Sequence, residues 1–348
     1  MEKEPSIHLS LEQVHQLSYR SLLACGCDQA NARAVADTIT AAERDCCHSH
    51  GLFRLSGYIA SLKSGKVNGH ADPQLEQLAP AVLRIHGDNG YAPLALQRGR
   101  DPLIGCARKQ GIAALSIIHT HHFAALWMEV SALVEQGLCA FAFTAYMPCV
   151  APAGGSKPFY GTNPMAFGWP RKGVPPMVFD QASAAMARGE IMLAQQAGLP
   201  VSEGVGLDLN GHPTTDPGAI LEGAQLAFGG HKGAALALMI ELLVGPLLGE
   251  RCSFEAAEAD NGDGGPSRGG ELLLAIDPAR FGDPDHWADH AERVFTRLLE
   301  QPGTRLPADR RYQGREQTRL HGIKISSTLF AKIHALAGIT PGESFLHQ

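Results

Sequence analysis

The sequence predicts a mixed α and β fold in which helices come first. Apolar side chains recur at helical spacing through roughly the first 62 residues, whereas beyond about residue 75 short apolar runs divided by glycine and proline are typical of strands. The chain has 348 residues, 45% hydrophobic and 18% charged, so it can bury a large core in two or more lobes. No G-x-G-x-x-G segment follows an expected strand and opens a helix, so a standard Rossmann domain is not expected.

Three helices are expected in the first part of the chain. Ser10 and Gln13 stand at the positions of a capping box, and apolar residues continue at helical spacing from there to Gly26. Residues 32–39 carry an apolar face that indicates a second helix, which delivers the chain to a segment rich in polar side chains. Residues 51–62 are expected to form the third helix.

Later strands and helices follow from the apolar runs. Short runs bounded by glycine or proline predict strands at residues 112–118, 138–144 and 271–276. Residues 234–243 and 286–299 are expected to be helical. Residues 255–270 are acidic and rich in glycine, so we expect a mobile loop there.

Composition and charge exclude several classes of partner. The net charge is −6 and basic residues do not cluster in long runs, which argues against nucleic acid or an anionic membrane. Residues 1–6 lack the apolar run of a signal peptide, and the most apolar later stretch, residues 234–248, contains Glu241, Gly245 and Pro246. The eight cysteines show no CxxC spacing, which favours reduced thiols. We therefore expect a soluble cytoplasmic protein.

The most informative segment runs from Cys46 to Arg54. His50 can donate a proton near neutral pH, and Ser49 can orient its ring or relay the proton. Arg54 can bind a carboxylate through two parallel hydrogen bonds, and on a helix its spacing of four residues puts it on one face with His50. The alternative is structural: His50 caps a helix, and Arg54 makes a surface ion pair.

Two further segments are suited to binding anions. Residues 229–233, Gly-Gly-His-Lys-Gly, directly precede the helix expected at residues 234–243, so backbone N–H groups and an ammonium can face a phosphate. Residues 305–311 contain three arginines beside a proline, a composition suited to a diphosphate or a 2′-phosphate. Glycine-rich helix starts are common, however, and the arginines could form a solvated basic turn.

Histidine clusters raise the alternative of a metal-dependent hydrolase. His48 with His50 and His119 with His121 and His122 offer imidazoles that could bind zinc or nickel. The oxygen ligand would come from one of three acids: Asp45, Asp180 and Glu190. Neither cluster has the H-E-x-x-H spacing, and in a hydrolase the anion-binding segments at residues 229–233 and 305–311 would have no function. We therefore predict no metal.

Taken together, the motifs make the chain resemble the type-2 malate/L-lactate dehydrogenase family nearly end to end. The residues that carry the resemblance are Ser49, His50, Gly51 and Arg54; His121, His122 and Phe123; residues 160–164 with 166–168; Val178, Phe179 and Asp180; residues 229–233; and residues 306–311. Each motif alone is common, but the set is highly specific.

Within the family the chain is most similar to the cyclic ketimine reductases. His48 stands before Ser49 and His50, and residues 121–127 continue His-His-Phe-Ala-Ala-Leu-Trp where the hydroxy-acid dehydrogenases usually have Phe-Gly. Glu190 supplies an acid after Gly189, where the hydroxy-acid branch tends to carry lysine and the reductases carry an acid.

The resemblance implies a fold, a cofactor and a reaction. It implies a helical N-terminal segment at residues 1–75 that packs with residues 285–348, and an NAD(P)H-binding and substrate region at residues 76–284 built on a largely antiparallel, non-Rossmann sheet, usually in a homodimer. It implies NADPH, with NADH as a weaker cofactor. The substrate would be a small cyclic imino acid, delta1-pyrroline-2-carboxylate or delta1-piperideine-2-carboxylate, reduced to L-proline or L-pipecolate.

The resemblance also implies a role for each site residue. The catalytic group would be His50, Ser49 and Glu190, and the substrate would be bound by Arg54 and Thr162. The cofactor would be bound by His122, Asp180, Gln181, Ala182, His231, Lys232, Arg305, Asp309, Arg310 and Arg311. Asp180 alone could equally be a turn residue at a strand end.

Two other functions remain open from the sequence. A malate, lactate or ureidoglycolate-type dehydrogenase would use His50 as a base against a hydroxyl and Arg54 on the same carboxylate. A non-catalytic binding protein on an enzyme scaffold is disfavoured, because every expected catalytic position is filled.

Overall fold

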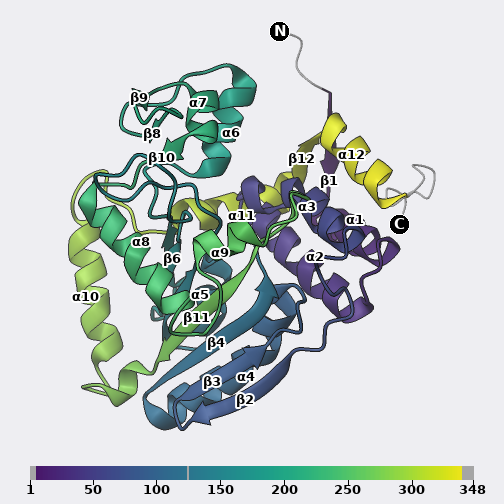
Figure 1. Cartoon of the computed structure of the whole chain (residues 1–348). Helices are drawn as coiled ribbons and strands as arrows, with labels where there is room; N and C mark the ends of the chain where they lie inside the picture. The colour runs from purple at the N-terminus through teal and green to yellow at the C-terminus, as the bar shows by residue number, and fades with distance from the viewer. Residues whose placement is uncertain (1–4, 124, 339–348) are drawn as a thin grey trace.

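The centre of the protein is a mixed sheet of seven strands (Figure 1). The computed structural model describes residues 5–123 and 125–338. From edge to edge the strands are β2 (Gln74–Ala79), β3 (Val82–His86), β4 (Ile112–His121), β11 (Arg268–Ile276), β5 (Cys139–Thr144), β6 (Met165–Trp169) and β7 (Met177–Gln181). Within this sheet β3 and β4 are parallel and the other neighbouring strands are antiparallel. The expected mixed α and β fold with a largely antiparallel sheet is confirmed.

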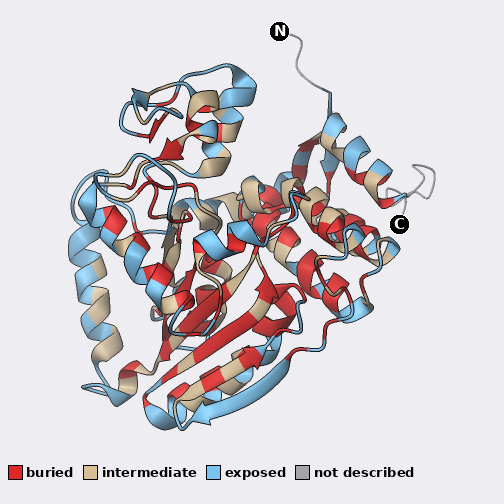
Figure 2. Cartoon of the chain, in the orientation of Figure 1, coloured by how far each residue is buried: buried red, intermediate tan, exposed pale blue. Residues whose placement is uncertain are grey.

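Helices cover both faces of this sheet. The first face carries α4 (Ala92–Gln110) and α5 (Trp127–Val134), and its core includes the fully buried Leu115 and Trp127. Side chains alternate along a strand, so Leu273 faces this core while Leu272 faces the other. There α8 (His231–Val244) packs against β5 and β11. Figure 2 shows that buried residues concentrate in the central strands between these layers.

The N-terminal helices form a second layer together with the end of the chain. This layer consists of β1 (Ser6–Leu9), α1 (Leu11–Ala24), α2 (Gln29–Arg44), α3 (Leu52–Lys63), β12 (Ile323–Ser326) and α12 (Ser327–Ala337). The strands β1 and β12 pair antiparallel, and one core joins Val14, Ile39 and Ile333. The expected capping box is present, because Ser10 Oγ accepts from Gln13 N at 3.1 Å and Gln13 Oε1 accepts from Ser10 N at 2.8 Å.

A smaller lobe lies beside the main sheet (Figure 1). Its elements are α6 (Arg188–Ala197), β8 (Gly206–Leu207), β9 (Pro213–Thr214), α7 (Pro217–Glu222) and β10 (Ala224–Gln225). Ile191, Val205 and Ile220 form its core. The lobe therefore has its own apolar centre, and the first turn of α6 is held on it by Ile191.

The remaining elements connect these layers. They are η1 (His48–His50), α9 (Ser253–Glu258), η2 (Pro278–Arg280), α10 (Trp287–Leu299) and α11 (Asp309–His321). An ion pair of 2.7 Å between Arg171 and Glu292 ties the main sheet to α10. Arg315 of α11 donates two hydrogen bonds, of 2.7 and 2.8 Å, to Asp45 at the end of α2.

Most of the expected secondary structure is confirmed, with one correction. The strands expected at residues 112–118, 138–144 and 271–276 are β4, β5 and β11, and the expected helices are α1, α2, α3, α8 and α10. The loop expected at residues 255–270 is wrong at both ends, because α9 includes residues 255–258 and β11 begins at Arg268. The acidic residue that suggested a loop instead starts a helix, since Glu255 accepts a hydrogen bond from Cys252 N at 2.8 Å. The domain boundaries near residues 75 and 285 stay a prediction.

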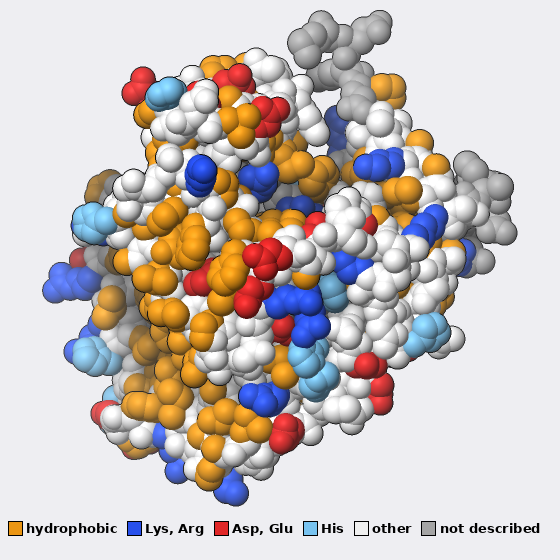
Figure 3. Space-filling view, viewed as in Figure 1, with side chains coloured by type: hydrophobic (Ala, Val, Ile, Leu, Met, Phe, Trp, Pro, Cys, Tyr) orange, Lys and Arg blue, Asp and Glu red, His pale blue; other side chains and the backbone are white. Residues whose placement is uncertain are grey.

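The surface includes an apolar area over α8. Figure 3 shows hydrophobic side chains gathered on this part of the viewed face. Leu238, Leu242 and Leu247 are between 44% and 62% exposed. Among the helices of residues 5–123 and 125–338, none combines the length and the apolar character that crossing a membrane requires.

Candidate active site

A cavity of about 880 Å³ lies between the N-terminal layer, the main sheet and the smaller lobe. Its walls come from η1 and α3, from the ends of β4, β5 and β7, and from the first turns of α6. The cavity therefore brings together expected site residues that are far apart in the sequence: Ser49, His50, Arg54, His122, Thr162, Asp180, Gln181, Ala182 and Glu190. The volume lies in the range of small-molecule and cofactor sites.

Ser49 and His50 form a hydrogen-bonded pair at this cavity. Ser49 Oγ lies 3.1 Å from His50 Nδ1, and the His50 ring meets Trp127 edge-on with centroids 6.1 Å apart. The expected shared helix face of His50 and Arg54 is wrong, because η1 ends at His50 and α3 begins only after Gly51. Both side chains nevertheless line the cavity.

His50 is neutral near pH 7 in the free protein. Burial, with the positive charges of Arg54 and His122, lowers the pKa of His50 to about 4. A neutral ring next to a hydroxyl can accept or pass on a proton, but it does not hold one ready to donate. A proton donor role for His50 therefore requires that a bound ligand change its surroundings.

Glu43 fixes the turn that carries these side chains, and sequence reasoning missed it. Its carboxylate is buried, accepts from Leu52 N at 2.8 Å and lies 2.5 Å from His48 Nδ1. This contact raises the pKa of His48. Gly51 leaves room for the carboxylate, since an added Cβ would lie 2.1 Å from Glu43 Oε1. The absence of an Asp, Asn, Ser or Thr at the start of α3 was the available signal that a distant residue caps it.

Arg54 projects from the first turn of α3. Its Nε donates to Ser49 O at 2.8 Å, and its guanidinium lies 4.9 Å from the centre of the Phe123 ring. Burial lowers the pKa of Arg54, but a guanidinium remains charged at neutral pH. Held by one backbone contact and by the rings of Phe53 and Phe123, it can present its other N–H groups to a carboxylate.

Thr162 and Tyr146 reach the cavity from two loops that a buried network joins. Asn163, which follows Thr162, is fully buried and has a φ of 36°. Its Nδ2 donates to Glu241 Oε2 at 2.7 Å, and Glu241 also accepts from Ser253 Oγ at 2.8 Å. The network holds the Thr162 backbone in place, and Tyr146 was another lining residue that sequence reasoning missed.

The first turn of α6 closes the cavity on the side of the smaller lobe. Arg188, Gly189 and Glu190 all line it. A Cβ added at Gly189 would lie 3.4 Å from Ser49 Cβ, so this turn passes close to the catalytic segment. Glu190 is exposed, as its place in the first turn of α6 requires.

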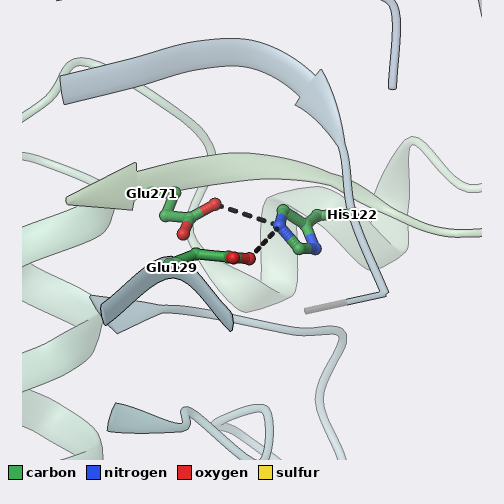
Figure 4. A group of neighbouring side chains, drawn as sticks. All are labelled: His122, Glu129 and Glu271. Atoms are coloured by element: carbon green, nitrogen blue, oxygen red, sulfur yellow. Dashed lines mark ion pairs between the residues drawn. The ribbon is translucent and has the colours of Figure 1, made fainter. Parts of the chain in front are cut away.

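His122 is buried against two glutamates that sequence reasoning missed (Figure 4). Its Nε2 lies 3.3 Å from Glu129 Oε1 and 3.1 Å from Glu271 Oε2, and the three side chains are 9%, 6% and 1% exposed. Although burial opposes it, the charges and hydrogen bonds of Glu271 and Glu129 raise the pKa of His122 to about 10. His122 therefore carries a positive charge beside the cavity at neutral pH.

Of the histidines named for a metal site, His50 and His122 line the same cavity, whereas His119 and His121 make other contacts. His119 Nδ1 contacts His86 Nε2, and His121 Nδ1 donates to Pro266 O at 3.2 Å. His122 faces Glu129 and Glu271, which form a different group from the acids expected for such a site.

A family model described as malate/L-lactate dehydrogenase matches residues 9–334. The chain belongs to the malate/L-lactate dehydrogenase family. The resemblance that the sequence motifs indicated is thereby confirmed.

Individual members of this dehydrogenase family are similar over nearly the whole chain. Delta(1)-pyrroline-2-carboxylate reductase of Ancylobacter novellus is 50% identical over 333 residues, which cover 95% of this chain and 97% of the relative. A Pseudomonas aeruginosa delta(1)-pyrroline-2-carboxylate/delta(1)-piperideine-2-carboxylate reductase is 48% identical and covers 95% and 99%. The crystal structure of delta1-piperideine-2-carboxylate reductase from Pseudomonas syringae pv. tomato superposes with a TM-score of 0.90 at 41% identity, over 95% and 99% of the two chains.

The dehydrogenase family implies a nicotinamide cofactor, and one wall of the cavity carries three of the residues that were expected to bind it. Asp180, Gln181 and Ala182 line this wall at the end of β7. Asp180 is bound by Arg311, whose Nη2 donates at 2.8 Å and whose guanidinium lies 4.7 Å from the centre of the Trp127 ring. Burial raises the pKa of Asp180, while Arg311 opposes the shift. Polar acceptors and donors on an otherwise apolar wall suit a large, partly charged ligand.

Other residues expected to bind the cofactor lie outside the residues that line the cavity. His231 and Lys232 are exposed at the start of α8, after Gly229 and Gly230 with φ of 57° and 63°. Arg305 and Arg310 are exposed near α11, and Asp309 accepts from Leu306 N at 2.8 Å. The role of these residues in cofactor binding therefore stays a prediction.

Proposed function

We propose that this member of the dehydrogenase family is an NADPH-dependent cyclic ketimine reductase. It would convert delta1-pyrroline-2-carboxylate and delta1-piperideine-2-carboxylate to L-proline and L-pipecolate. The observation that carries the proposal is that the Ser49–His50 pair, Arg54 and Thr162 line one cavity. The names of relatives at 41–50% identity support the same substrates.

Substrate binding would depend on Arg54 and Thr162. The 2-carboxylate of the ketimine would take two hydrogen bonds from the Arg54 guanidinium, whose orientation is fixed by Ser49 O and Phe123. Thr162 would add a hydrogen bond from the opposite wall. Fixing the carboxylate fixes which face of the C=N bond is open to attack, and orientation of this kind supplies much of a catalytic rate.

Proton supply would fall to His50. In the free protein the charge of Arg54 helps to keep His50 neutral. A substrate carboxylate at Arg54 would offset that charge and raise the pKa of His50. Substrate binding would therefore itself favour protonation of the His50 ring. Ser49 Oγ orients the ring, and Glu190 near the same turn would reload it. His50 would then hold or deliver the proton at the imine nitrogen.

The cofactor would lie along the wall that carries Asp180, Gln181 and Ala182. Bound NADPH supplies a hydride, which is added to C2 of the ring. His122 would contact the part of the cofactor nearest the substrate. The phosphate end would be bound by His231, Lys232, Arg305, Asp309, Arg310 and Arg311. The exposed guanidiniums of Arg305 and Arg310 support NADPH over NADH, because a 2′-phosphate needs a cation.

A homodimer is part of the same proposal. The exposed apolar side chains Leu238, Leu242 and Leu247 support an interface over α8. Light scattering after size exclusion would measure twice the mass of the 348-residue chain if the proposal holds.

One assay tests the function. The purified protein is mixed with NADPH and, in parallel, with delta1-pyrroline-2-carboxylate, delta1-piperideine-2-carboxylate, pyruvate and oxaloacetate, and loss of reduced-cofactor absorbance is followed. We expect oxidation with the cyclic imines. Oxidation of NADPH with the keto acids alone would indicate a hydroxy-acid dehydrogenase. No oxidation of NADPH with any of the four substrates would contradict the proposal. Repeating the assay with NADH measures the cofactor preference.

A further inference from the structure

The cavity contains a second arginine, Arg188, that the proposed reaction does not use. Arg188 begins α6 and lines the cavity from the side of the smaller lobe, whereas Arg54 lines it from α3. One of its N–H groups donates to Leu221 O at 3.3 Å. A guanidinium carries five N–H donors, so this contact orients Arg188 and leaves most of its donors for another acceptor.

Both arginines act on the same group in the cavity. Burial raises the pKa of Tyr146, and the positive charges of Arg54 and Arg188 each lower it. Burial also raises the pKa of Cys149 to about 11, against the charge of Arg188. Both guanidiniums line the same cavity as Tyr146 and lie close enough to it to lower its pKa.

Neither arginine is neutralised by a carboxylate in the described part of the chain. The cation–carboxylate pairs found there include Arg311 with Asp180 but none for Arg54 or Arg188. Both side chains are half-buried, where a guanidinium without an acid loses hydration that an anion would replace. A cavity lined by two such cations concentrates anions.

The proposed substrate has one carboxylate, which Arg54 would hold. We propose that Arg188 binds a second anionic group in the same cavity, either a carboxylate or a phosphate. This group has two possible sources: a second carboxylate on a dicarboxylic ketimine, or the diphosphate of the cofactor. Both sources suit a guanidinium, because its planar fork matches two oxygens of a carboxylate or a phosphate. The inference rests on the proposed function only where the ketimine is concerned.

Paired ligands separate the two sources. KM is measured at saturating NADPH for delta1-piperideine-2-carboxylate and for delta1-piperideine-2,6-dicarboxylate, which differ by one carboxylate, and Kd for NADPH is measured by fluorescence without substrate. If Arg188 binds the second carboxylate, Arg188→Gln raises KM at least tenfold for the dicarboxylate alone. If it binds the diphosphate, Arg188→Gln raises Kd for NADPH at least tenfold and leaves both KM values within twofold.

A matched control and a conservative variant complete the test. Arg171→Gln removes another partly buried arginine, one paired with Glu292 away from the cavity, and should leave all three constants within twofold. Arg188→Lys keeps the charge without the planar fork and should give a smaller change in the same constant; it also serves if Arg188→Gln does not fold. Unchanged constants in both Arg188 variants would overturn the inference. Because the fluorescence titration needs no turnover, it reports on Arg188 even if the protein reduces no ketimine.

Discussion

The chemistry of this protein depends on a few side chains whose properties come from their neighbours. His50 would be an ordinary imidazole on the surface, but burial beside Arg54 and His122 lowers its pKa to about 4. His122 is also an imidazole, and Glu129 and Glu271 raise its pKa to about 10. At neutral pH His50 is therefore neutral and His122 is positively charged, which suits His50 to exchange protons and His122 to stay charged.

Replacing His50 tests the proton-transfer role. His50→Ala should lower kcat by roughly 10²–10⁴ while leaving KM for the ketimine within a few-fold, because the ring moves a proton but does not hold the carboxylate. Steady-state oxidation of NADPH gives both constants. Ser49→Ala, which removes the hydrogen bond of 3.1 Å to the ring, should give a smaller loss. Wild-type turnover in His50→Ala would end the proposed role.

Replacing Arg54 tests carboxylate binding. Arg54→Ala should weaken ketimine binding by about 2–5 kcal/mol, since it leaves a desolvated carboxylate without its partner. The change should appear mainly as a higher KM in the same assay. Arg54→Lys should recover part of the loss, because it keeps the charge but not the two parallel hydrogen bonds. An unchanged KM in Arg54→Ala would show that the carboxylate is bound elsewhere.

Short helices and their ends place these side chains. The turn η1 and the helix α3 meet at Gly51, and Glu43 of α2 fills the space that a side chain there would need. The capping of α3 therefore comes from a residue of the preceding helix and not from the local sequence. This explains why a helix with no polar residue at its start begins so sharply after the catalytic histidine.

A methyl group at this junction should disturb both stability and catalysis. In Gly51→Ala the new Cβ would lie 2.1 Å from Glu43 Oε1, so the carboxylate must move and the unfolding free energy should fall by about 1–3 kcal/mol. Thermal melting and kcat are both measured. Gly105→Ala in α4 is the control, because an added Cβ meets nothing within 4 Å there and should not reduce stability. Equal melting temperatures for wild type and Gly51→Ala would refute the clash.

At the level of the complete molecule, two buried histidines make the stability depend on pH in the acid range. Burial lowers the pKa of both His50 and His121 to about 4, whereas an unfolded histidine titrates near 6.5. Between these two pH values the two histidines bind protons in the unfolded chain but stay neutral in the folded chain. The stability that His50 and His121 contribute is therefore present above about pH 6.5 and is lost as the pH falls toward 4.

Calorimetry between pH 7.5 and 4.5 measures this loss. Each of the two histidines should contribute a slope of up to about 1.4 kcal/mol per pH unit over that window. His121→Gln, which lies away from the proposed catalytic group, should flatten the decline relative to wild type. A decline of equal steepness in both proteins would show that His121 does not titrate as stated.

Much of this fold can be predicted from local patterns in the sequence. A few neighbouring residues are enough to identify three of its features. These are the capping box of Ser10 and Gln13, the apolar strands β4, β5 and β11, and the motif of Ser49, His50 and Arg54. Helical and strand periodicity arises from backbone geometry, so a short window is enough to detect it. The short strands β8, β9 and β10 have only two residues each and leave no such pattern.

The amino-acid order thus specified the mixed fold, the family and the side chains around His50. It did not reveal that β11 lies between β4 and β5, or that Glu43 caps α3. It also did not reveal that Glu129 and Glu271 raise the pKa of His122, or that Arg188 lines the same cavity as Arg54. Each of these joins residues that are distant in the chain, and such contacts form only when the whole core is packed. Charge states follow the same rule, because a pKa depends on burial and on neighbouring charges that no local sequence pattern contains.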